Sequence, residues 1–297
     1  MINNGEGPTV TLTGGVHGDE YEGPVTLLNL AREIDPAQVN GRIIMIPCLN
    51  LPAVQSGDRC SPIDDLNLNR VFPGNANGTV TEMIAHYISS EIVPLSGLHL
   101  DMHSGGKTLE YKPCIFLNDP GSKDKQENAR RLVDAFGAEV TILEDDAFPD
   151  GGRFLTAAFA RAGVLNFSCE LGGAGQVNPA IVSMATHGAK NMLREFGVLS
   201  GEVVSPENQG RLPSIVARVP DGECYIMAED SGLYEPFIDL GDPVSAGQVI
   251  GQIHYPDDLA KSPLAVTSSR TGFLLCKRAP GKTRRGDNIA IIAQAIS

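Results

Sequence analysis

Two short stretches carry the side-chain types that bind a catalytic metal. The first reads Thr-Gly-Gly-Val-His-Gly-Asp-Glu and contains His17 and Glu20, and the second reads Leu-Asp-Met-His-Ser-Gly-Gly and contains His103. Each follows an apolar run and contains glycines, which is typical of a strand that opens into a loop. Histidine and glutamate three residues apart project to one side of a helical turn. Two imidazoles and one carboxylate, with a fourth position left for water, form the ligand set of a catalytic zinc site.

The elements that must position these residues alternate between strand and helix. Runs of strand length lie at 10–12, 43–46, 98–102, 114–117, 140–143 and 164–168, and helical patterns lie at 22–34, 81–92, 123–136, 153–162 and 179–196. This alternation predicts an α/β fold with a largely parallel or mixed central sheet flanked by helices. The segments of His17, His103 and Glu170 all follow strands, and ligands of such sheets collect at the carboxyl ends of strands.

The pattern changes after Gly201. Short apolar runs alternate with Gly and Pro, as in Leu-Gly-Asp-Pro-Val-Ser-Ala-Gly-Gln, and no helical period of useful length occurs. This predicts a small C-terminal all-β domain, a barrel or sandwich, that serves as a lid or specificity wall. We place the catalytic domain at residues 1–203 and the C-terminal domain at residues 204–297.

Composition excludes several classes of partner. The chain has 297 residues, of which 42% are hydrophobic and 20% charged, as in an ordinary globular protein. A net charge of −13 argues against nucleic acid or an anionic membrane surface as the main partner. Neither a signal-peptide pattern nor a bilayer-spanning apolar stretch is evident, so we expect a cytoplasmic enzyme. The six cysteines show no Cys-x-x-Cys spacing. The sequence leaves open whether identical chains associate as a homo-oligomer.

A lone His-x-x-Glu spacing is common by chance, and the remaining motifs give it weight. Asn-Leu-Asn-Arg-Val-Phe-Pro-Gly at residues 67–74 falls between the two histidine stretches, and Ser-Cys-Glu-Leu-Gly-Gly at residues 168–173 follows them. In this order the four segments resemble the succinylglutamate desuccinylase/aspartoacylase family, a branch of the zinc carboxypeptidase-like amidohydrolases. Within it, residues 18–24 and 78–86 resemble the deacetylases of ectoine breakdown, which act on N-alpha-acetyl-2,4-diaminobutyrate.

The resemblance implies a role for each motif residue. One Zn²⁺ per chain would be bound by three ligands, and Glu170 would act as general base and acid beside it. Arg59 would polarise the scissile carbonyl, although an insertion at residues 61–64 disturbs its spacing. Asn69 and Arg70 match the family's carboxylate-binding pair. Asn67 stands where aspartoacylases usually have aspartate. The three metal ligands in this set are His17, Glu20 and His103.

We therefore predict a zinc-dependent hydrolase of a small N-acyl amino acid, with N-alpha-acetyl-L-2,4-diaminobutyrate as substrate. Glu144-Asp145-Asp146 can attract a side-chain ammonium, or it can be a solvated turn. The alternatives within enzymes are a succinylglutamate desuccinylase, an aspartoacylase or a true carboxypeptidase. The alternative of another class is a non-catalytic binding module that keeps the fold. Asp101 is expected either to orient His103 or to pack against a helix end. The histidines at 86, 99, 187 and 254 are expected to be surface or packing residues.

Overall fold

A mixed β-sheet forms the centre of the fold. A computed structural model describes residues 1–118, 123–144, 152–204 and 212–296 of the chain. In its first part the strand order is β1-β3-β2-β4-β8-β6-β7. The strands β3, β2, β4 and β8 run parallel, whereas β6 runs antiparallel to β8. Their bounds are β1 (Ile2–Asn4), β2 (Thr9–Gly14), β3 (Gly41–Ile46), β4 (Leu98–His103), β6 (Cys114–Asn118), β7 (Val140–Glu144) and β8 (Leu165–Glu170).

Helices bury an apolar core on each side of this sheet. One core gathers residues of α1, α4 and α6, and the other gathers residues of α3 and α5. The predicted α/β class with a mixed sheet flanked by helices is confirmed. The helices are α1 (Glu22–Glu33), α2 (Leu51–Ser56), α3 (Val80–Tyr87), α4 (Lys123–Phe136), α5 (Leu155–Arg161) and α6 (Pro179–Glu195), with short turns η1 (Pro36–Gln38), η2 (Leu68–Arg70), η3 (Ile88–Ile92) and η4 (Val93–Leu95).

Strand β4 shows how the sheet separates packing from chemistry. Successive side chains of a strand point to opposite faces. Leu98, Leu100 and Met102 therefore enter the core beneath α1 and α6. The other side chains of the strand lie on the opposite face, toward α5, and belong to His99, Asp101 and His103. The ring of His99 stacks there on Phe159. A strand that is buried on both faces thus carries three polar groups on one of them.

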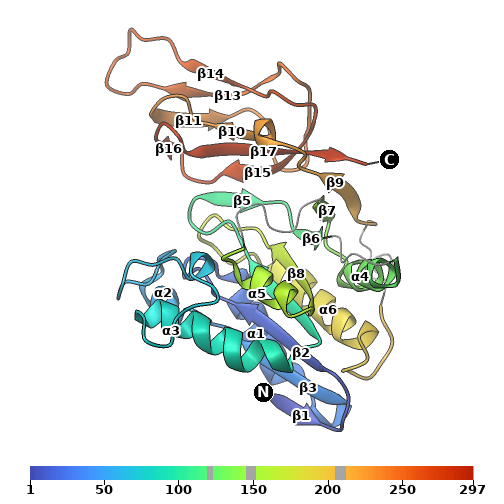
Figure 1. The fold of residues 1–297 in the computed structure, drawn as a ribbon. Coiled ribbons are helices and arrows are strands. Elements are labelled where there is room, and N and C mark those ends of the chain that lie inside the picture. The colour runs from blue at the N-terminus through green and yellow to red at the C-terminus, as the bar shows by residue number, and fades with distance from the viewer. Residues whose placement is uncertain (119–122, 145–151, 205–211, 297) are drawn as a thin grey trace.

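The C-terminal region is built from strands, as predicted, and it continues the central sheet. Strand β9 pairs with β7 of the α/β part and with β17, so one sheet runs through both parts. Strand β5 (Leu109–Tyr111) also pairs with β15. Figure 1 shows β1 to β3 at one end of the molecule and the strands from β10 onward at the other. The bounds are β9 (Ile215–Arg218), β10 (Tyr225–Met227), β11 (Gly232–Pro236), β12 (Pro243–Val244), β13 (Val249–His254), β14 (Leu264–Thr267), β15 (Gly272–Arg278), β16 (Lys282–Thr283) and β17 (Asn288–Ala295), with a turn η6 (Gly222–Cys224).

A second sheet completes this region. It has the strand order β14-β13-β11-β16, and its apolar side chains pack with those of β15 and β17 in a separate core that includes Ile250, Ile253, Ile289 and Ile292. The boundary between residues 203 and 204 stays a prediction. Among the described residues, no helix is long and apolar enough to cross a membrane.

Candidate active site

The loop after β2 places His17 and Glu20 against α2. Gly18 makes this approach possible, because a Cβ at this position would lie 1.9 Å from the carbonyl oxygen of Ala53. The amide of Gly18 donates a hydrogen bond of 3.0 Å to the carbonyl oxygen of Asp58. Helix α1 then begins at Glu22, as the acidic residue at that position predicts. The Gly-rich loop is therefore fixed at both ends.

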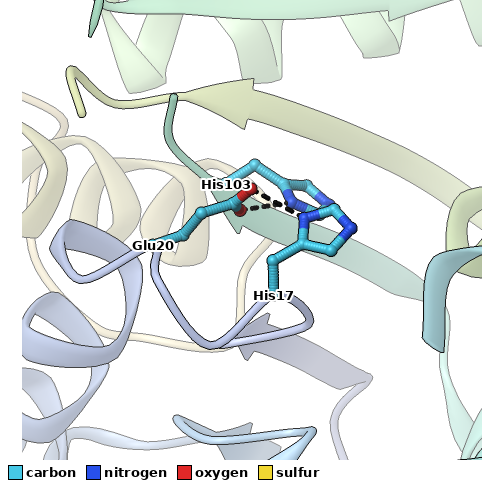
Figure 2. A group of neighbouring side chains, drawn as sticks. All are labelled: His17, Glu20 and His103. Atoms are coloured by element: carbon cyan, nitrogen blue, oxygen red, sulfur yellow. Dashed lines mark hydrogen bonds and ion pairs between the residues drawn. The ribbon is translucent and has the colours of Figure 1, made fainter. Parts of the chain in front are cut away.

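The carboxylate of Glu20 faces two neighbouring imidazole rings, one from this loop and one from the end of β4 (Figure 2). Its Oε1 is 2.7 Å from Nδ1 of His17, and its Oε2 is 2.7 Å from Nδ1 of His103. The three side chains are buried, and their ligand atoms all lie within 4.8 Å of one another. The structure thus brings together the three residues that the sequence predicts as metal ligands.

The outer nitrogen of each ring has its own partner. Nε2 of His103 lies 2.8 Å from Oδ2 of Asp101, and Nε2 of His17 lies 3.2 Å from Oδ1 of Asn67. An acceptor at Nε2 keeps the proton there and leaves the Nδ1 lone pair free to bind a metal. The donor set of two imidazoles and a carboxylate fits Zn²⁺. Of the two roles that the sequence left open for Asp101, this contact favours orientation of His103 over packing against a helix end, whereas the contact of Asn67 was not predicted.

Burial and charge act in opposite directions on these groups. Burial alone would raise the pKa of Glu20, but His103 and His17 outweigh it and hold that pKa well below its ordinary value. Burial likewise opposes the charged form of His103, yet the carboxylates of Asp101 and Glu20 raise its pKa well above the usual range. At His17 burial wins and the pKa is lowered. The site therefore holds a carboxylate between two rings of different basicity.

Glu170 ends β8 and lies beside the candidate metal centre. It is the register partner of His103 on the neighbouring strand. Burial, reinforced by the negative charge of Glu20, raises its pKa to about 8. Its Oε2 has no hydrogen-bond partner among the described residues. A half-buried carboxyl group with an elevated pKa and a buried, unsatisfied oxygen is suited to exchange protons with a ligand.

These groups open into one cavity of about 600 Å³. Its wall comes from the strand ends, from the 59–70 segment, from α5 and from the C-terminal region. Tyr225 of β10 is the contribution of that last region. The lining residues are His17, Glu20, Arg59, Asn69, Arg70, His103, Ser104, Gly105, Thr108, Leu109, Tyr111, Phe116, Asn118, Glu144, Phe154, Thr156, Ser168, Glu170 and Tyr225.

The remaining predicted site residues also lie in this cavity. Nη1 of Arg59 donates a hydrogen bond of 3.2 Å to Oε1 of Glu20. Oδ1 of Asn69 accepts a bond of 2.8 Å from the amide of Leu155. The guanidinium of Arg70 lies 4.8 Å from the centre of the Phe154 ring. Nη1 of Arg70 donates a hydrogen bond of 2.7 Å to the carbonyl oxygen of Asn69.

The acidic triplet is only partly described. Glu144 ends β7 and lines the cavity, beside its register partner Asn118 on β6. Asp145 and Asp146 lie outside the described residues. The side chain of Glu144 lines the cavity, and the surrounding residues remove part of its hydration. This desolvation raises the pKa of its carboxyl group to about 7. This is a carboxyl group that a cationic ligand would convert to its charged form.

The other histidines divide into two kinds. His99 is fully buried and stacks on Phe159 with ring centres 3.7 Å apart, so it packs as the sequence predicts. Burial lowers its pKa to about 4. Neither His187, which is exposed on α6, nor the histidines at 86 and 254 line the cavity.

The fold and this site together define an α/β protein with a buried His-Glu-His cluster at strand ends. Residues 6–196 match the family model described as "Succinylglutamate desuccinylase/Aspartoacylase catalytic domain". The chain belongs to this family, which is named for two enzymes that remove acyl groups from amino acids.

Similar proteins agree with this assignment. An N-alpha-acetyl-L-2,4-diaminobutyric acid deacetylase of Halomonas elongata is 38% identical over 296 residues, which cover 100% of this chain and 85% of that protein. A succinylglutamate desuccinylase/aspartoacylase structure from Rhodobacter sphaeroides has a TM-score of 0.92 at 35% identity, covering 99% of this chain and 88% of the other. The product-bound ectoine utilization protein EutE (DoeB) from Ruegeria pomeroyi has a TM-score of 0.91 at 36% identity, covering 98% of this chain and 87% of the other.

Proposed function

We propose that this protein is a zinc-dependent amidohydrolase that removes the acetyl group from N-alpha-acetyl-L-2,4-diaminobutyrate. The observation that carries the proposal is that His17, Glu20, His103 and Glu170 meet in one cavity. The 38% identity with a deacetylase of that substrate supports the choice of acyl group and amino acid. A non-catalytic binding module would have no need of a carboxyl group with an elevated pKa beside a metal centre.

Each residue has a distinct task in this reaction. Zinc held by His17, Glu20 and His103 would supply a Lewis acid and lower the pKa of water at the site toward neutrality. Glu170 takes a proton from the attacking water while the oxygen of that water adds to the acetyl carbonyl carbon. The C–N bond then breaks, and Glu170 delivers a proton to the leaving nitrogen. The products are acetate and the free amino acid.

Two arginines stabilise negative charge at different points of the cavity. Arg59, which already lies within hydrogen-bond distance of Glu20, donates to the developing oxyanion. Arg70 and Asn69 bind the α-carboxylate of the substrate. The guanidinium of Arg70 stacks on Phe154, and a planar guanidinium can bind a carboxylate bidentately, which a lysine cannot reproduce.

Charge in the cavity favours a substrate with a cationic side chain. Among the described residues that line the cavity, the lysines and arginines are Arg59 and Arg70 alone. Both already have a role, at the oxyanion and at the α-carboxylate. A succinyl or aspartyl substrate brings a second carboxylate that needs a further cation. Lys107 or Arg153 could supply one, but neither is among the residues that line the cavity, and Lys107 forms an ion pair of 3.2 Å with Asp58. Glu144 offers a carboxylate that can pair with the side-chain ammonium of diaminobutyrate.

A substrate comparison tests the proposal. We expect kcat/KM for N-alpha-acetyl-2,4-diaminobutyrate to exceed those for N-succinylglutamate and N-acetylaspartate by at least about tenfold, because a buried, unpaired substrate charge weakens transition-state binding. Released amine would be measured for the purified protein with each compound. A preference for a dicarboxylic substrate would make the protein a desuccinylase or aspartoacylase, and the absence of any hydrolysis would favour a binding module.

The role of Glu144 has its own test. Glu144→Gln should lower kcat/KM for the diaminobutyrate substrate about tenfold, since it removes the partner of the ammonium. It should change little for N-alpha-acetyl-2-aminobutyrate, which lacks that ammonium. Because the carboxyl pKa is raised to about 7, Glu144 is neutral at lower pH, and the wild-type preference between the two compounds should weaken below pH 7. Equal losses on both compounds would show that Glu144 is structural.

A further inference from the structure

A chain of hydrogen bonds continues from His103 away from the candidate metal centre. Asp101, which is fully buried, uses one carboxylate oxygen for Nε2 of His103 at 2.8 Å. Its other oxygen accepts a hydrogen bond of 2.7 Å from the hydroxyl of Thr13. The same hydroxyl oxygen lies 2.9 Å from Nε2 of His99. The four residues therefore form one continuous polar chain inside the sheet.

The direction of each bond in this chain is determined. A hydroxyl has a single proton, and Thr13 donates that proton to the carboxylate of Asp101. Its oxygen must then accept from Nε2 of His99, which places the proton of this ring on Nε2. Nδ1 of His99 is buried without a hydrogen-bond partner among the described residues. That nitrogen is therefore the unprotonated one, and the ring is neutral.

Packing holds the chain rigidly. Thr13 and Asp101 are register partners on the parallel strands β2 and β4, so the strand pairing itself brings them together. Thr13 and His99 are fully buried. The ring planes of His99 and Phe159 are inclined by only 7°, which fixes the direction of the Nε2–H bond. Each member of the chain is thus confined by the sheet or by α5.

We propose that Thr13 and His99 are positioning residues of the metal centre. They hold the carboxylate of Asp101 in one orientation, so that it keeps a proton on Nε2 of His103 and directs Nδ1 toward the metal. This inference rests on the proposed zinc-dependent function. Outer partners of metal-binding histidines typically contribute 10- to 100-fold in metal affinity. Thr13 acts one bond further away, so we expect about tenfold from it.

Two variants of Thr13 separate positioning from packing. Thr13→Val keeps the volume and β-branching but removes the hydroxyl, whereas Thr13→Ser keeps the hydroxyl. Zinc affinity would be measured by competition with a chromophoric chelator on the metal-free protein. We expect the valine variant to bind zinc about tenfold more weakly than wild type and the serine variant to remain within about threefold. Equal affinity of the two variants would overturn the proposal.

A measurement without metal makes this result independent of the zinc assignment. In ¹⁵N-edited NMR spectra of the metal-free protein, His99 should show a neutral ring protonated on Nε2. The hydrogen-bonded Nε2 proton of His103 should be retained in Thr13→Ser and shifted or lost in Thr13→Val. A His99 ring protonated on Nδ1, or a His103 signal that is the same in both variants, would refute the positioning role. A wild-type protein that shows these signals but binds no zinc would refute the proposed function alone.

Discussion

His103→Ala should abolish both zinc binding and activity. In the structure His103 supplies one of two imidazoles that meet the Glu20 carboxylate, and its Nδ1 lies 2.7 Å from Oε2 of that carboxylate. Its loss leaves two protein ligands where catalytic zinc sites use three. Since the metal contributes several kcal/mol of transition-state stabilisation, and 1.36 kcal/mol corresponds to tenfold in rate, the loss of activity should be at least about 10³-fold. Metal analysis of the purified variant and released amine measure the two effects.

A matched control is available on α6. His187 is exposed, and its Nδ1 lies 2.7 Å from the carbonyl oxygen of Ser183 one turn earlier in the helix. His187→Ala should keep about one zinc per chain and wild-type turnover. Stripping the wild-type protein with a chelator should remove its activity, and added zinc should restore it. The central proposal fails if the native protein contains no zinc and if zinc, cobalt and manganese all leave it inactive.

Local sequence pattern predicts most of the α/β part. Strand-length apolar runs and helical periods agree with α1, α4, α5 and α6 and with β2, β3, β4, β6, β7 and β8 to within a few residues, because each of these elements buries a continuous face. The helix predicted at residues 81–92 instead ends at Tyr87 and continues as the π-helical turn η3. Thr79 and Glu82 form a capping box that marks the beginning of this helix. Helix α2 was not predicted, since it spans only Leu51–Ser56.

Long-range pairings could not be predicted in the same way. The apolar run of β9 follows the predicted domain boundary, yet it pairs with β7 and β17 and joins the two parts in one sheet. Its sequence is compatible with any short strand. The choice of partner depends on the position of β7, which is more than 70 residues earlier in the chain. Such non-local contacts leave no periodic signal in either segment.

The candidate site shows the same division. Residue type and order were enough to select His17, Glu20 and His103, because few side chains bind zinc. They could not reveal the contact of Thr13 with Asp101 or that of Asn67 with His17, because these side chains are ordinary in a strand and at the start of a turn. Only the pairing of β2 with β4 places Thr13 against Asp101, and only the path of the 59–70 segment brings Asn67 to His17.

Glu170→Gln should retain zinc and fold while kcat falls by on the order of 10²- to 10⁴-fold, the range typical of general acid–base groups. Glutamine keeps the size of the side chain but cannot take a proton from water. The exposed glutamate at position 139, which pairs with Lys112, provides a control, and Glu139→Gln should leave kcat unchanged. Thermal unfolding and metal content would confirm that both variants are intact.

The pH dependence identifies this group more specifically than the loss of rate does. A general base must be deprotonated, so kcat/KM should fall as pH decreases through the pKa of Glu170. Burial and the charge of Glu20 raise that pKa to about 8 in the absence of metal. A bound dication favours the carboxylate, so the acid limb of the zinc enzyme should lie below pH 8. Measured with N-alpha-acetyl-2-aminobutyrate, which has no ammonium for Glu144 to pair with, this limb should disappear from the residual activity of Glu170→Gln. A glutamine variant within a few-fold of wild type, or one that keeps the same acid limb, would show that another residue is the base.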